Sequence, residues 1–375
     1  MSAAVSLIRP ELVPPSLMDE LEESAELTAV SGKPDPRAIA ALRASGLLGA
    51  AVPVVYGGAG GDAAALNRIV ERVATVNPSV AIILFQHFAV SARIDEWGAS
   101  EQKAALLPDF AGGRILAASA WSETGAGAAK KKLATTGARL DFDRWLLQGA
   151  KSFTTGAGVA DIYLVLAQTS AARDDPASSY GSAGQSFFLV RKDNPGLVPD
   201  LSLDLVGMRG SATGFVSLRE CVVADTDRLG PLGEAPKIIA GVRETGATLG
   251  AVAVGIAEAA FGIAVEHTGR LAPDAAQALR HRLVKATTLV AAARALVTTA
   301  GQRSSGDPGP ITLQSKLFAS TVAEQVCVEV ARMLGSAGYI VEHRLNRLAA
   351  DARAIALMGP TNELCRELVA QTWQG

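Results

Sequence analysis

The chain has 375 residues, of which 49% are hydrophobic and 19% charged, and its formal net charge is −2. This length requires two or three domains or layers, and the near-neutral charge gives no electrostatic footprint for nucleic acid. The cysteines Cys221, Cys327 and Cys365 are odd in number, which argues against a disulfide framework, and neither they nor the four histidines are spaced for a metal. We therefore expect a folded protein of a reducing compartment, without metal or nucleic acid as ligand.

No targeting or membrane segment is expected. The N-terminal residues lack a basic start followed by a continuous apolar run, so we predict no signal peptide. The most membrane-like run, residues 249–265, contains Glu258 and falls short of the roughly 20 apolar residues of a membrane span. We interpret it as a buried helix, and we expect a cytoplasmic protein.

The first part of the chain predicts an all-helical domain over residues 1–113. Asp35 is a suitable N-cap for a helix over residues 36–48, because Pro36 stands at its first position. Helical spacing of apolar residues predicts further helices over residues 17–29, 64–76, 80–97 and 101–110. A Gly-Gly pair at residues 112–113 ends this domain.

The pattern then changes to period 2, which predicts an antiparallel β-domain over residues 114–230. Strands are expected at residues 162–168, 187–190 and 215–223, and the polar residues 171–185 are expected to form a surface loop. Helical spacing returns at residues 237–268, 273–301, 311–335 and 361–372. The fold class is therefore α+β, with a C-terminal four-helix-bundle domain over residues 231–375.

A Gly-rich stretch over residues 119–169 has the features of a cofactor site. Residues 122–127 (SETGAG) form a turn behind a short apolar run, and residues 151–155 (KSFTT) follow a Gly149-Ala150 turn. Backbone N–H groups and hydroxyls at such turns suit an oxygen-rich planar cofactor better than a metal ion. Taken alone, the same residues are compatible with an ordinary β-turn and a core Phe153.

With its neighbours, this stretch resembles the flavin-binding β-domain of the acyl-CoA dehydrogenase family. That family carries a Thr-Glu-Pro turn followed by Gly-Ser-Asp, and then a Lys-x-Trp-Ile-Thr-Asn strand. Here the two read SETGAGAA (residues 122–129) and KSFTTG (residues 151–156). Further family motifs follow in the family's order at residues 207–213, 334–339, 351–353 and 359–364. The resemblance covers about residues 42–370.

The resemblance implies FAD as cofactor, with its ring between the β-domain and the C-terminal helices. By motif position, the implied cofactor contacts are Trp121, Ser122, Phe153, Thr155, Arg332, Thr361 and Glu363. Ser122 corresponds to the contact with the pyrimidine end of the ring, and Thr155 to the contact on the N5 side. Phe153 replaces a Trp and keeps the stacking surface without the indole N–H. Arg332 replaces a Gln, and it could pair with a diphosphate or lie on the surface.

The resemblance implies α,β-dehydrogenation of an acyl thioester of CoA or of an acyl carrier protein. In many relatives the base is a Glu in the last motif, but that position here is Gly359, which retains only a backbone N–H to polarise the thioester carbonyl. Other relatives place the base on an earlier helix. Counting to Arg270 puts Glu244 there, whereas aligning on residues 255–257 puts Thr245 there, a difference of about 100° around the helix. Glu244 is thus the candidate base, with a solvated carboxylate as the alternative.

Two departures concern positive charge. The Arg that relatives carry after that base falls on Thr245 or Gly246, so we expect a helix-borne charge near the acyl entrance to be lost. Residues 130–132 (KKK) are absent from the family pattern, and we expect a solvated loop, with attraction of CoA phosphates as the alternative.

The leading hypothesis is an FAD-dependent acyl-CoA dehydrogenase-type oxidoreductase that passes electrons to electron-transfer flavoprotein or another acceptor. A flavin monooxygenase or oxidase on the same fold, or a non-catalytic subunit of a heteromer, are the alternatives. Ala/Gly-rich faces in residues 249–265 and 290–300 also predict a homodimer or homotetramer.

Overall fold

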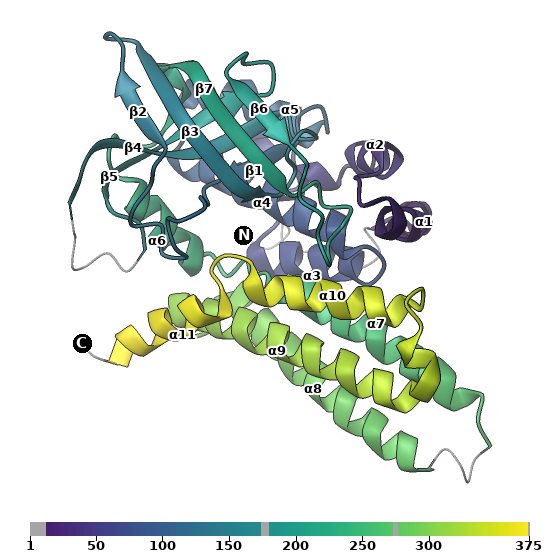
Figure 1. Cartoon of the computed structure of the whole chain (residues 1–375). Coiled ribbons are helices and arrows are strands. Elements are labelled where there is room, and N and C mark those ends of the chain that lie inside the picture. The colour runs from purple at the N-terminus through teal and green to yellow at the C-terminus, as the bar shows by residue number, and fades with distance from the viewer. Residues whose placement is uncertain (1–12, 174–179, 273–276, 374–375) are drawn as a thin grey trace.

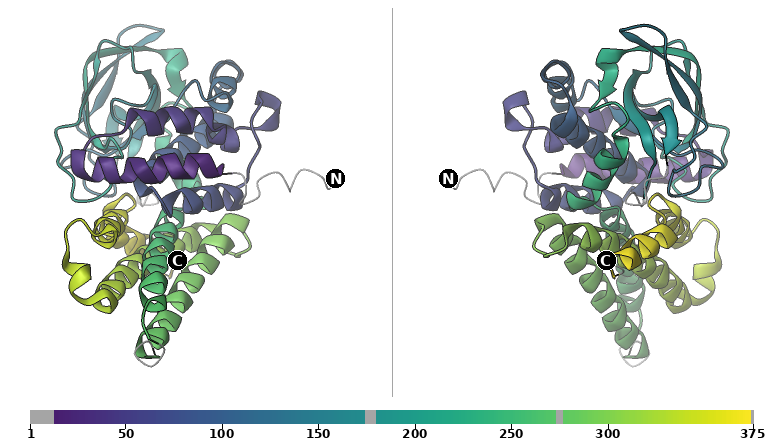
Figure 2. Two further views of the ribbon diagram at one scale, coloured as in Figure 1. Left: turned by 90° about the vertical axis from the view of Figure 1, so that its right-hand side faces the viewer. Right: turned by 90° about the vertical axis from the view of Figure 1, so that its left-hand side faces the viewer.

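A computed structural model describes residues 13–173, 180–272 and 277–373. Helices come first in the chain, a β-sheet follows, and helices return at the end (Figure 1). The sheet and the C-terminal helices from residue 250 onward lie on opposite sides of the molecule, with α3 (Ala63–Ala74) and α4 (Pro78–Trp97) between them. Helices α1 and α2 lie on the sheet side, and the C-terminal helices extend away from them (Figure 2). The predicted α+β fold with a helical, a β and a second helical part is confirmed.

The N-terminal helices are α1 Pro15–Ser31, α2 Pro36–Ala44, α3 Ala63–Ala74, α4 Pro78–Trp97 and α5 Ser100–Ala111. Side chains cap the starts of α2, α3 and α4, through Asp35, Asp62 and Asn77. The predicted N-cap is confirmed, because the Asp35 carboxylate accepts from the Arg37 N–H at 3.0 Å. The helix after it is shorter than predicted: Gly46 has a φ of 77°, and a 3₁₀ turn at Leu47–Ala51 replaces the last turns.

The sheet is mostly antiparallel but contains two parallel pairs. Its strands are β1 Ala117–Ala120, β2 Thr136–Arg139, β3 Arg144–Thr154, β4 Ile162–Arg173, β5 Ala183–Arg191, β6 Leu197–Asp200, β7 Gly214–Ala224 and β8 Arg228–Leu229. The order is β6-β7-β3-β2-β4-β5-β8, and β1 and β2 both pair with β4 in parallel. The purely antiparallel prediction was wrong here, because the long excursion between β1 and β4 lets the chain return in the same direction.

The predicted loop over residues 171–185 was also partly wrong. Strand β4 continues to Arg173, which pairs with Ala183 at the start of β5. Residues 174–179 of that loop lie outside the described residues. The hairpin brings Tyr180, at its β5 end, back to the body of the molecule, where its side chain is buried.

The C-terminal helices contain one break that the sequence did not predict. They are α6 Ala235–Glu244, α7 Gly250–Gly269, α8 Gln277–Gln302, α9 Pro308–Leu334, α10 Arg344–Leu357 and α11 Asn362–Ala370. The single helix expected over residues 237–268 is two helices, because Gly246 has a φ of 82° and its Cα lies against Ala300, whose carbonyl oxygen would be 2.1 Å from an added Cβ. The Asn67 amide holds the break, donating to the Gly246 carbonyl at 2.9 Å and accepting from the Thr248 N–H at 3.1 Å.

Two further predictions differ from the structure in this region. Helix α10 was not expected as a helix, although its Asp-Ala-Arg motif was noted. Residues 273–276, at the start of the helix expected over 273–301, lie outside the described residues.

Helix α7 is the central helix of the C-terminal part. Its residues 250–257 are all buried, and it packs against α3, α8, α9 and α10. At Gly255 an added Cβ would lie 2.4 Å from the Glu71 carbonyl oxygen, so glycine permits the close approach to α3. Helices α7 and α8 are both long and apolar enough to cross a membrane by length and composition. For α7, burial in the core accounts for that apolar character.

A buried contact joins the β-domain to α10. The Met208 N–H donates to Asp351 Oδ1 at 2.5 Å, and an added Cβ on Gly207 would lie 2.3 Å from the Ala350 carbonyl oxygen. Burial raises the pKa of Asp351 to about 6, although the Met208 N–H and the charge of Arg347 act in the opposite direction. The loop after β6 therefore packs directly against helix α10.

The raised pKa of Asp351 predicts a pH-dependent stability. Between about pH 4 and 6 the folded state holds a proton on this carboxyl that the unfolded state has lost, so the free energy of unfolding falls as pH rises. The total change for a shift of this size is about 3 kcal/mol. Urea unfolding across this range should show the wild-type protein losing stability relative to Asp351→Asn, which keeps an acceptor for Met208. Parallel curves for the two proteins would contradict the prediction.

Candidate active site

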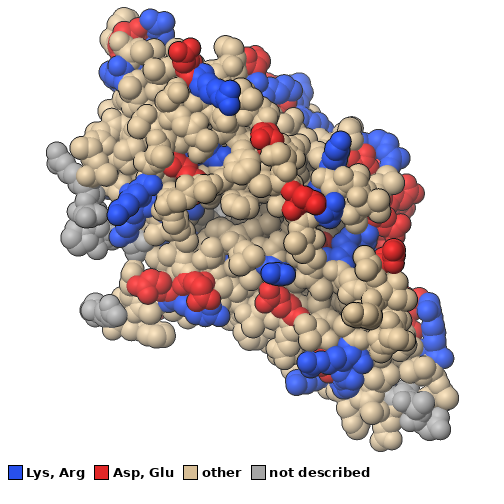
Figure 3. All heavy atoms as spheres, viewed as in Figure 1, with Lys and Arg blue, Asp and Glu red and all other residues tan. Residues whose placement is uncertain are grey.

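A deep cavity of about 900 Å³ lies between the sheet and the C-terminal helices. In Figure 3 the surface is hollowed at this position, between the β-domain above and the helices below. Its walls come from the turns after β1 and β3, the loop after β6, and helices α4, α6, α9 and α10. Residues far apart in the chain therefore meet at one site, as expected where separate domains join.

The end of β3 presents an aromatic ring to the cavity. Phe153 is 63% exposed, although it belongs to a strand, and its φ of 53° lies in the left-handed region. The β3–β7 pairing shifts register between Lys151 and Thr154, so Phe153 sits on a bulge. A positive φ is uncommon for a bulky residue and carries a cost of about 1–2 kcal/mol, which the surrounding structure must offset. The bulge turns the ring out of the sheet and into the cavity.

A buried ion pair fixes the turn that faces this ring. Lys151 Nζ donates to Glu123 Oε1 at 2.6 Å, and both side chains are almost fully buried. The same carboxylate accepts from the Ala134 and Thr135 N–H groups. Burial alone would raise the pKa of Glu123, but the Lys151 charge and these hydrogen bonds lower it below its usual value. The Glu123 carboxylate is thus held ionised by β3, and it holds both ends of the segment 123–135.

Several polar groups on the cavity wall have no partner among the described residues. Ser119 Oγ, Trp121 Nε1 and Ser152 Oγ are buried and unbonded, and all three residues line the cavity. Beside them, Thr155 Oγ1 and Thr213 Oγ1 are 3.0 Å apart, and both residues also line it. Buried polar groups are normally satisfied, so these atoms indicate a ligand with hydrogen-bonding groups along its edge.

The opposite wall comes from the helices and is positively charged. Gly359 lines the cavity just before α11, and Thr361 caps that helix by accepting from the Leu364 N–H at 3.2 Å. Lys316 of α9 donates to Asn362 Oδ1 at 2.7 Å, and burial lowers its pKa to about 8. Arg243 of α6 also lines the cavity, and it forms no ion pair with any described residue.

Lys130 is buried against this wall. Its side chain is 4% exposed, and Nζ donates to the Tyr180 hydroxyl at 2.7 Å and to the Ala128 carbonyl at 3.3 Å. Burial lowers the pKa of Lys130 to about 8. The solvated loop predicted over residues 130–132 is therefore wrong for Lys130, while Lys131 and Lys132 are exposed.

The carboxylates of the cavity wall are few. Among the described lining residues they are Glu123, which is held by Lys151, and Asp204, which is exposed and paired with Arg209 at 2.8 Å. The remaining charged side chains of the wall are the cations Lys130, Arg243, Lys316 and Arg353. The interior of the site therefore favours a negatively charged group.

The predicted site residues divide into two groups. Six of them line the cavity together: Trp121, Ser122, Phe153, Thr155, Gly359 and Thr361. Three do not: Arg332 is 70% exposed near Glu329, Glu363 is exposed and paired with Arg366, and Glu244 is exposed at the end of α6. The assignment of Glu244 as the base stays a prediction, and the structure gives this carboxylate no place on the cavity wall.

The register of α6 explains which charge reaches the cavity. The helix ends at Glu244, so its preceding residue Arg243 faces the cavity and Glu244 faces solvent. Thr245 and Gly246 carry no charge, but Arg243 places a positive charge on the cavity wall. The sequence carried no signal for the break that sets this register, since Gly246 reads as an ordinary glycine in an apolar helix.

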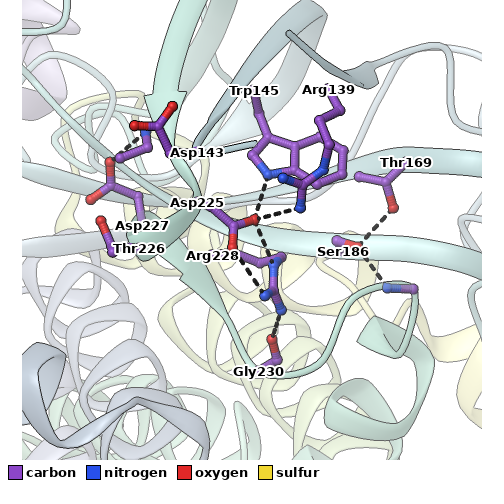
Figure 4. Close-up of polar contacts among 12 residues, drawn as sticks. Arg139, Asp143, Trp145, Thr169, Ser186, Asp225, Thr226, Asp227, Arg228 and Gly230 are labelled. Carbon is purple, nitrogen blue, oxygen red and sulfur yellow. Dashed lines mark hydrogen bonds and ion pairs between the residues drawn. The ribbon is translucent and has the colours of Figure 1, made fainter. Parts of the chain in front are cut away.

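A polar cluster at the edge of the sheet fixes the segment that leads into α6 (Figure 4). Asp225 accepts from Trp145 Nε1 at 2.7 Å and from Arg139 at 3.0 Å, and it also pairs with Arg228. Ser186 Oγ accepts from the Gly233 N–H at 2.8 Å. These contacts hold residues 225–234 against the sheet, so that α6 starts from a defined position.

Comparison with known proteins agrees with this arrangement over almost the whole chain. The acyl-CoA dehydrogenase N-terminal domain matches residues 15–114, the middle domain residues 118–221 and the C-terminal domain residues 238–373. The chain belongs to the acyl-CoA dehydrogenase family. A probable acyl-CoA dehydrogenase of Mycobacterium tuberculosis is 32% identical over 343 residues, which cover 89% of this chain and 86% of that protein.

Other members of the acyl-CoA dehydrogenase family are similar over a comparable length. An acyl-CoA dehydrogenase of Bacillus subtilis is 30% identical over 363 residues, covering 94% of this chain and 93% of that protein. The solved structure of butyryl-CoA dehydrogenase from Megasphaera elsdenii superposes with a TM-score of 0.87 at 27% identity, covering 98% of this chain and 97% of that one. The family consists of flavoprotein oxidoreductases, which implies a flavin cofactor.

The cavity fits a flavin on observations of its own. The exposed Phe153 ring offers an apolar face for a planar ring system, and the unpartnered Ser119, Trp121 and Ser152 groups suit its polar edge. The volume of about 900 Å³ leaves room for a second ligand beside it. The donor set holds hydroxyls and an indole N–H rather than metal ligands, and no cluster of metal-binding side chains occurs in the described residues.

Removing one partner of the buried Glu123–Lys151 pair should strongly lower the free energy of unfolding. Lys151→Met leaves an uncompensated carboxylate and should lower the free energy of unfolding by about 3–5 kcal/mol. The double variant Glu123→Gln with Lys151→Met should recover part of this loss. Urea unfolding measures both, with Lys192→Met as the matched control, because Lys192 pairs with Asp161 at an exposed position. Equal losses for Lys151→Met and Lys192→Met would contradict the prediction.

Proposed function

We propose that this protein is an FAD-dependent dehydrogenase that oxidises an acyl thioester of CoA or of an acyl carrier protein to its α,β-unsaturated form. The observation that carries the proposal is the single cavity in which the Phe153 ring and the unpartnered donors face Gly359. Bound flavin supplies the acceptor for the two electrons and the β-hydrogen that leave the substrate. Electron-transfer flavoprotein or another acceptor would then take the electrons away.

The chain contributes binding, orientation and electrostatics to this reaction. Phe153 would stack on the flavin ring, while Ser119, Trp121, Ser122, Ser152 and Thr155 would hydrogen-bond along its edge. The Gly359 N–H donates to no acceptor among the described residues, so it is free to polarise the thioester carbonyl. Lys316 and Arg243 would stabilise negative charge that develops on the same substrate.

The acyl chain has an apolar path into the same cavity. Phe85 and Ala89 of α4 face it from one side, and Ile239 and Val242 of α6 from the other. These side chains exclude water and offer dispersion contacts without polar atoms, which suits a hydrocarbon chain. The arrangement supports an acyl substrate and leaves its length and branching open to test.

A second candidate is a flavin monooxygenase or oxidase on the same fold. The observation that favours it is the absence of an unengaged carboxylate from the described cavity wall, since a reaction that removes no α-proton needs no such base. The dehydrogenase remains the first choice because the cationic wall around Gly359 suits the negative charge of a developing enolate.

An anaerobic titration distinguishes these candidates. The purified protein should be yellow from non-covalent FAD, and a suitable acyl-CoA should bleach the flavin absorbance without oxygen. A requirement for reduced flavin together with oxygen would favour the monooxygenase or oxidase. Protein that stays colourless after reconstitution with FAD would contradict both proposals and favour a non-catalytic subunit.

We also infer a homodimer or a dimer of dimers. On α8, Ala291, Ala292 and Ala295 form an exposed face of small residues, while residues 250–257 of the other predicted face are buried within the chain. Closed symmetric assembly is the common way to cover such a face. Light scattering at micromolar concentration should return a dimer or tetramer mass, and a monomer would contradict the inference.

A further inference from the structure

The space in front of Gly359 is bounded by an amine and a phenol. A Cβ added to Gly359 would lie 3.6 Å from Lys130 Nζ and 3.9 Å from the Tyr180 hydroxyl, and no other atom of the described residues, beyond the chain neighbours, comes within 4 Å. These are ordinary contact distances, so nothing in the backbone prevents a side chain at this position. Lys130 therefore reaches the place toward which a side chain at residue 359 would extend.

Lys130 is held there at an energetic cost. Its side chain is 4% exposed, no described carboxylate pairs with it, and its backbone has a φ of 53°. Burying an unpaired ammonium is unfavourable, and a non-glycine residue in the left-handed region adds strain. The surrounding backbone fixes it nonetheless: the Gln185 amide donates to the Lys130 carbonyl at 2.8 Å, and the Gly181 N–H donates to the Ala129 carbonyl at 2.7 Å. Strained backbone and buried charged groups without a counter-charge concentrate at functional sites.

The hydrogen bonds of Lys130 leave one position of the amine free. A neutral amine has two N–H donors and one lone pair, and the two donors are used by the Tyr180 hydroxyl and the Ala128 carbonyl. With both donors used in this way, the remaining position on the nitrogen carries the lone pair, which can accept a proton. Burial lowers the pKa of Lys130 to about 8, so the neutral amine is well populated just above that pH.

Burial favours the neutral form of the Lys130 amine, and several charged and titratable groups lie in or beside the same cavity. They are Lys151 on β3, Arg243 on α6, Lys316 on α9, Tyr180 before β5 and Glu123 after β1. Burial is the cause that lowers the pKa of Lys130, and among the cations the charge of Lys151 is the one coupled to it. The single carboxylate, Glu123, is committed to Lys151. A buried Tyr180 stays protonated, because burial raises the pKa of its hydroxyl.

We propose that Lys130 is the general base of this site: it takes the α-proton of the acyl thioester in place of the carboxylate that Gly359 lacks, and Tyr180 positions it. This assignment rests on the proposed dehydrogenase function. The α-carbon–hydrogen bond breaks and its proton goes to Lys130 Nζ, while its electron pair forms the new α,β double bond. The β-hydrogen leaves with its own electron pair, which the flavin of the proposed function accepts. Solvent later removes the proton from the ammonium.

The first experiment follows anaerobic flavin reduction by butyryl-CoA in stopped flow across pH 6–10. In the wild-type protein the rate should rise with pH through about 8, as Lys130 loses its proton. Lys130→Ala should slow reduction by about 10²–10⁴-fold and lose this pH limb. Lys130→Arg, whose guanidinium stays protonated, should be equally slow, while Lys131→Met at the exposed neighbour should match the wild type. Retained flavin and an unchanged circular dichroism spectrum show that a variant is folded.

Small amines should restore flavin reduction in a variant that lacks the base, but they would not do so if Lys130 had only a structural role. Ethylamine added to Lys130→Ala should restore part of the rate by entering the space that the lysine side chain leaves. Tyr180→Phe should retain the base but shift the pH limb, because the amine loses one hydrogen-bond partner. If Lys130→Ala reduces the flavin as fast as the wild type, or if Glu244→Gln is slow while Lys130→Ala is not, the assignment is overturned.

A carboxylate introduced at residue 359 tests the geometry, because its effect on the rate of flavin reduction should reverse when Lys130 is absent. In the wild-type background, Gly359→Glu should slow reduction, because the new carboxylate would pair with Lys130 and keep it protonated. In the Lys130→Ala background the same substitution should speed reduction, because the carboxylate becomes the base. A Gly359→Glu change that has the same sign in both backgrounds overturns the proposal.

A readout without flavin separates the base from the redox reaction. Acetoacetyl-CoA has an acidic α-proton, and its enolate has a distinct ultraviolet absorption. Flavin-free wild-type protein should stabilise the bound enolate more than Lys130→Ala does, and equal enolate formation overturns the assignment of Lys130. If the wild-type holoprotein reduces no flavin with any acyl-CoA, the proposed function fails and the base assignment fails with it. If the wild type and Lys130→Ala reduce the flavin equally fast, the proposed function stands and only the assignment of Lys130 as the base is overturned.

Discussion

The buried ion pair between Glu123 and Lys151 is the interaction on which the site depends most directly. It joins the turn after β1 to the middle of β3, and the same carboxylate holds the Ala134 and Thr135 N–H groups. Ser122 directly precedes Glu123, Lys130 lies within the segment that the Glu123 carboxylate closes, and Phe153 follows two residues after Lys151. Both the polar edge and the aromatic face of the cavity are thus positioned by one desolvated contact. A buried pair of this kind contributes little net stability, but it specifies one arrangement, because any other leaves a charge unpaired.

The second constraint is the buried contact between the β-domain and helix α10. Gly207 permits the approach to α10, and Asp351 then captures the Met208 N–H inside the contact. The cavity opens beside this joint, so the spacing between its two walls is set by a buried hydrogen bond rather than by loops. This explains how residues from helices, strands and loops that are far apart in the chain can line a single site without a ligand holding them together.

Sequence reasoning succeeded where local chemistry determines structure. Asp35 and Pro36 specify a helix start through their own side chains. Residues of the motifs around Ser122 and Phe153 line one cavity, and their role as cofactor contacts stays a prediction. Sequence reasoning failed where contacts with residues distant in the sequence determine the local structure. The end of α6 depends on Asn67 and on the Ala300 carbonyl against Gly246, and neither is near α6 in the sequence. The run of three lysines looks uniformly solvated, yet Tyr180 and Gln185 bury its first member.

The glycine at residue 359 and the burial of Lys130 explain each other. A carboxylate at 359 would stand within contact distance of Lys130 Nζ, and the pair would neutralise both groups in a desolvated cavity. Without that carboxylate, a buried lysine would be costly unless its charge were lost or used. The described carboxylates of the cavity wall are engaged elsewhere, so an ammonium at Lys130 has the Tyr180 hydroxyl and ring and the Ala128 carbonyl as partners but no counter-charge. The cationic side chains of the same wall attract the negative charge of a substrate enolate. A site with a buried amine in place of a carboxylate thus keeps a group that can accept a proton. Its positive charges also stabilise an anionic form of the substrate.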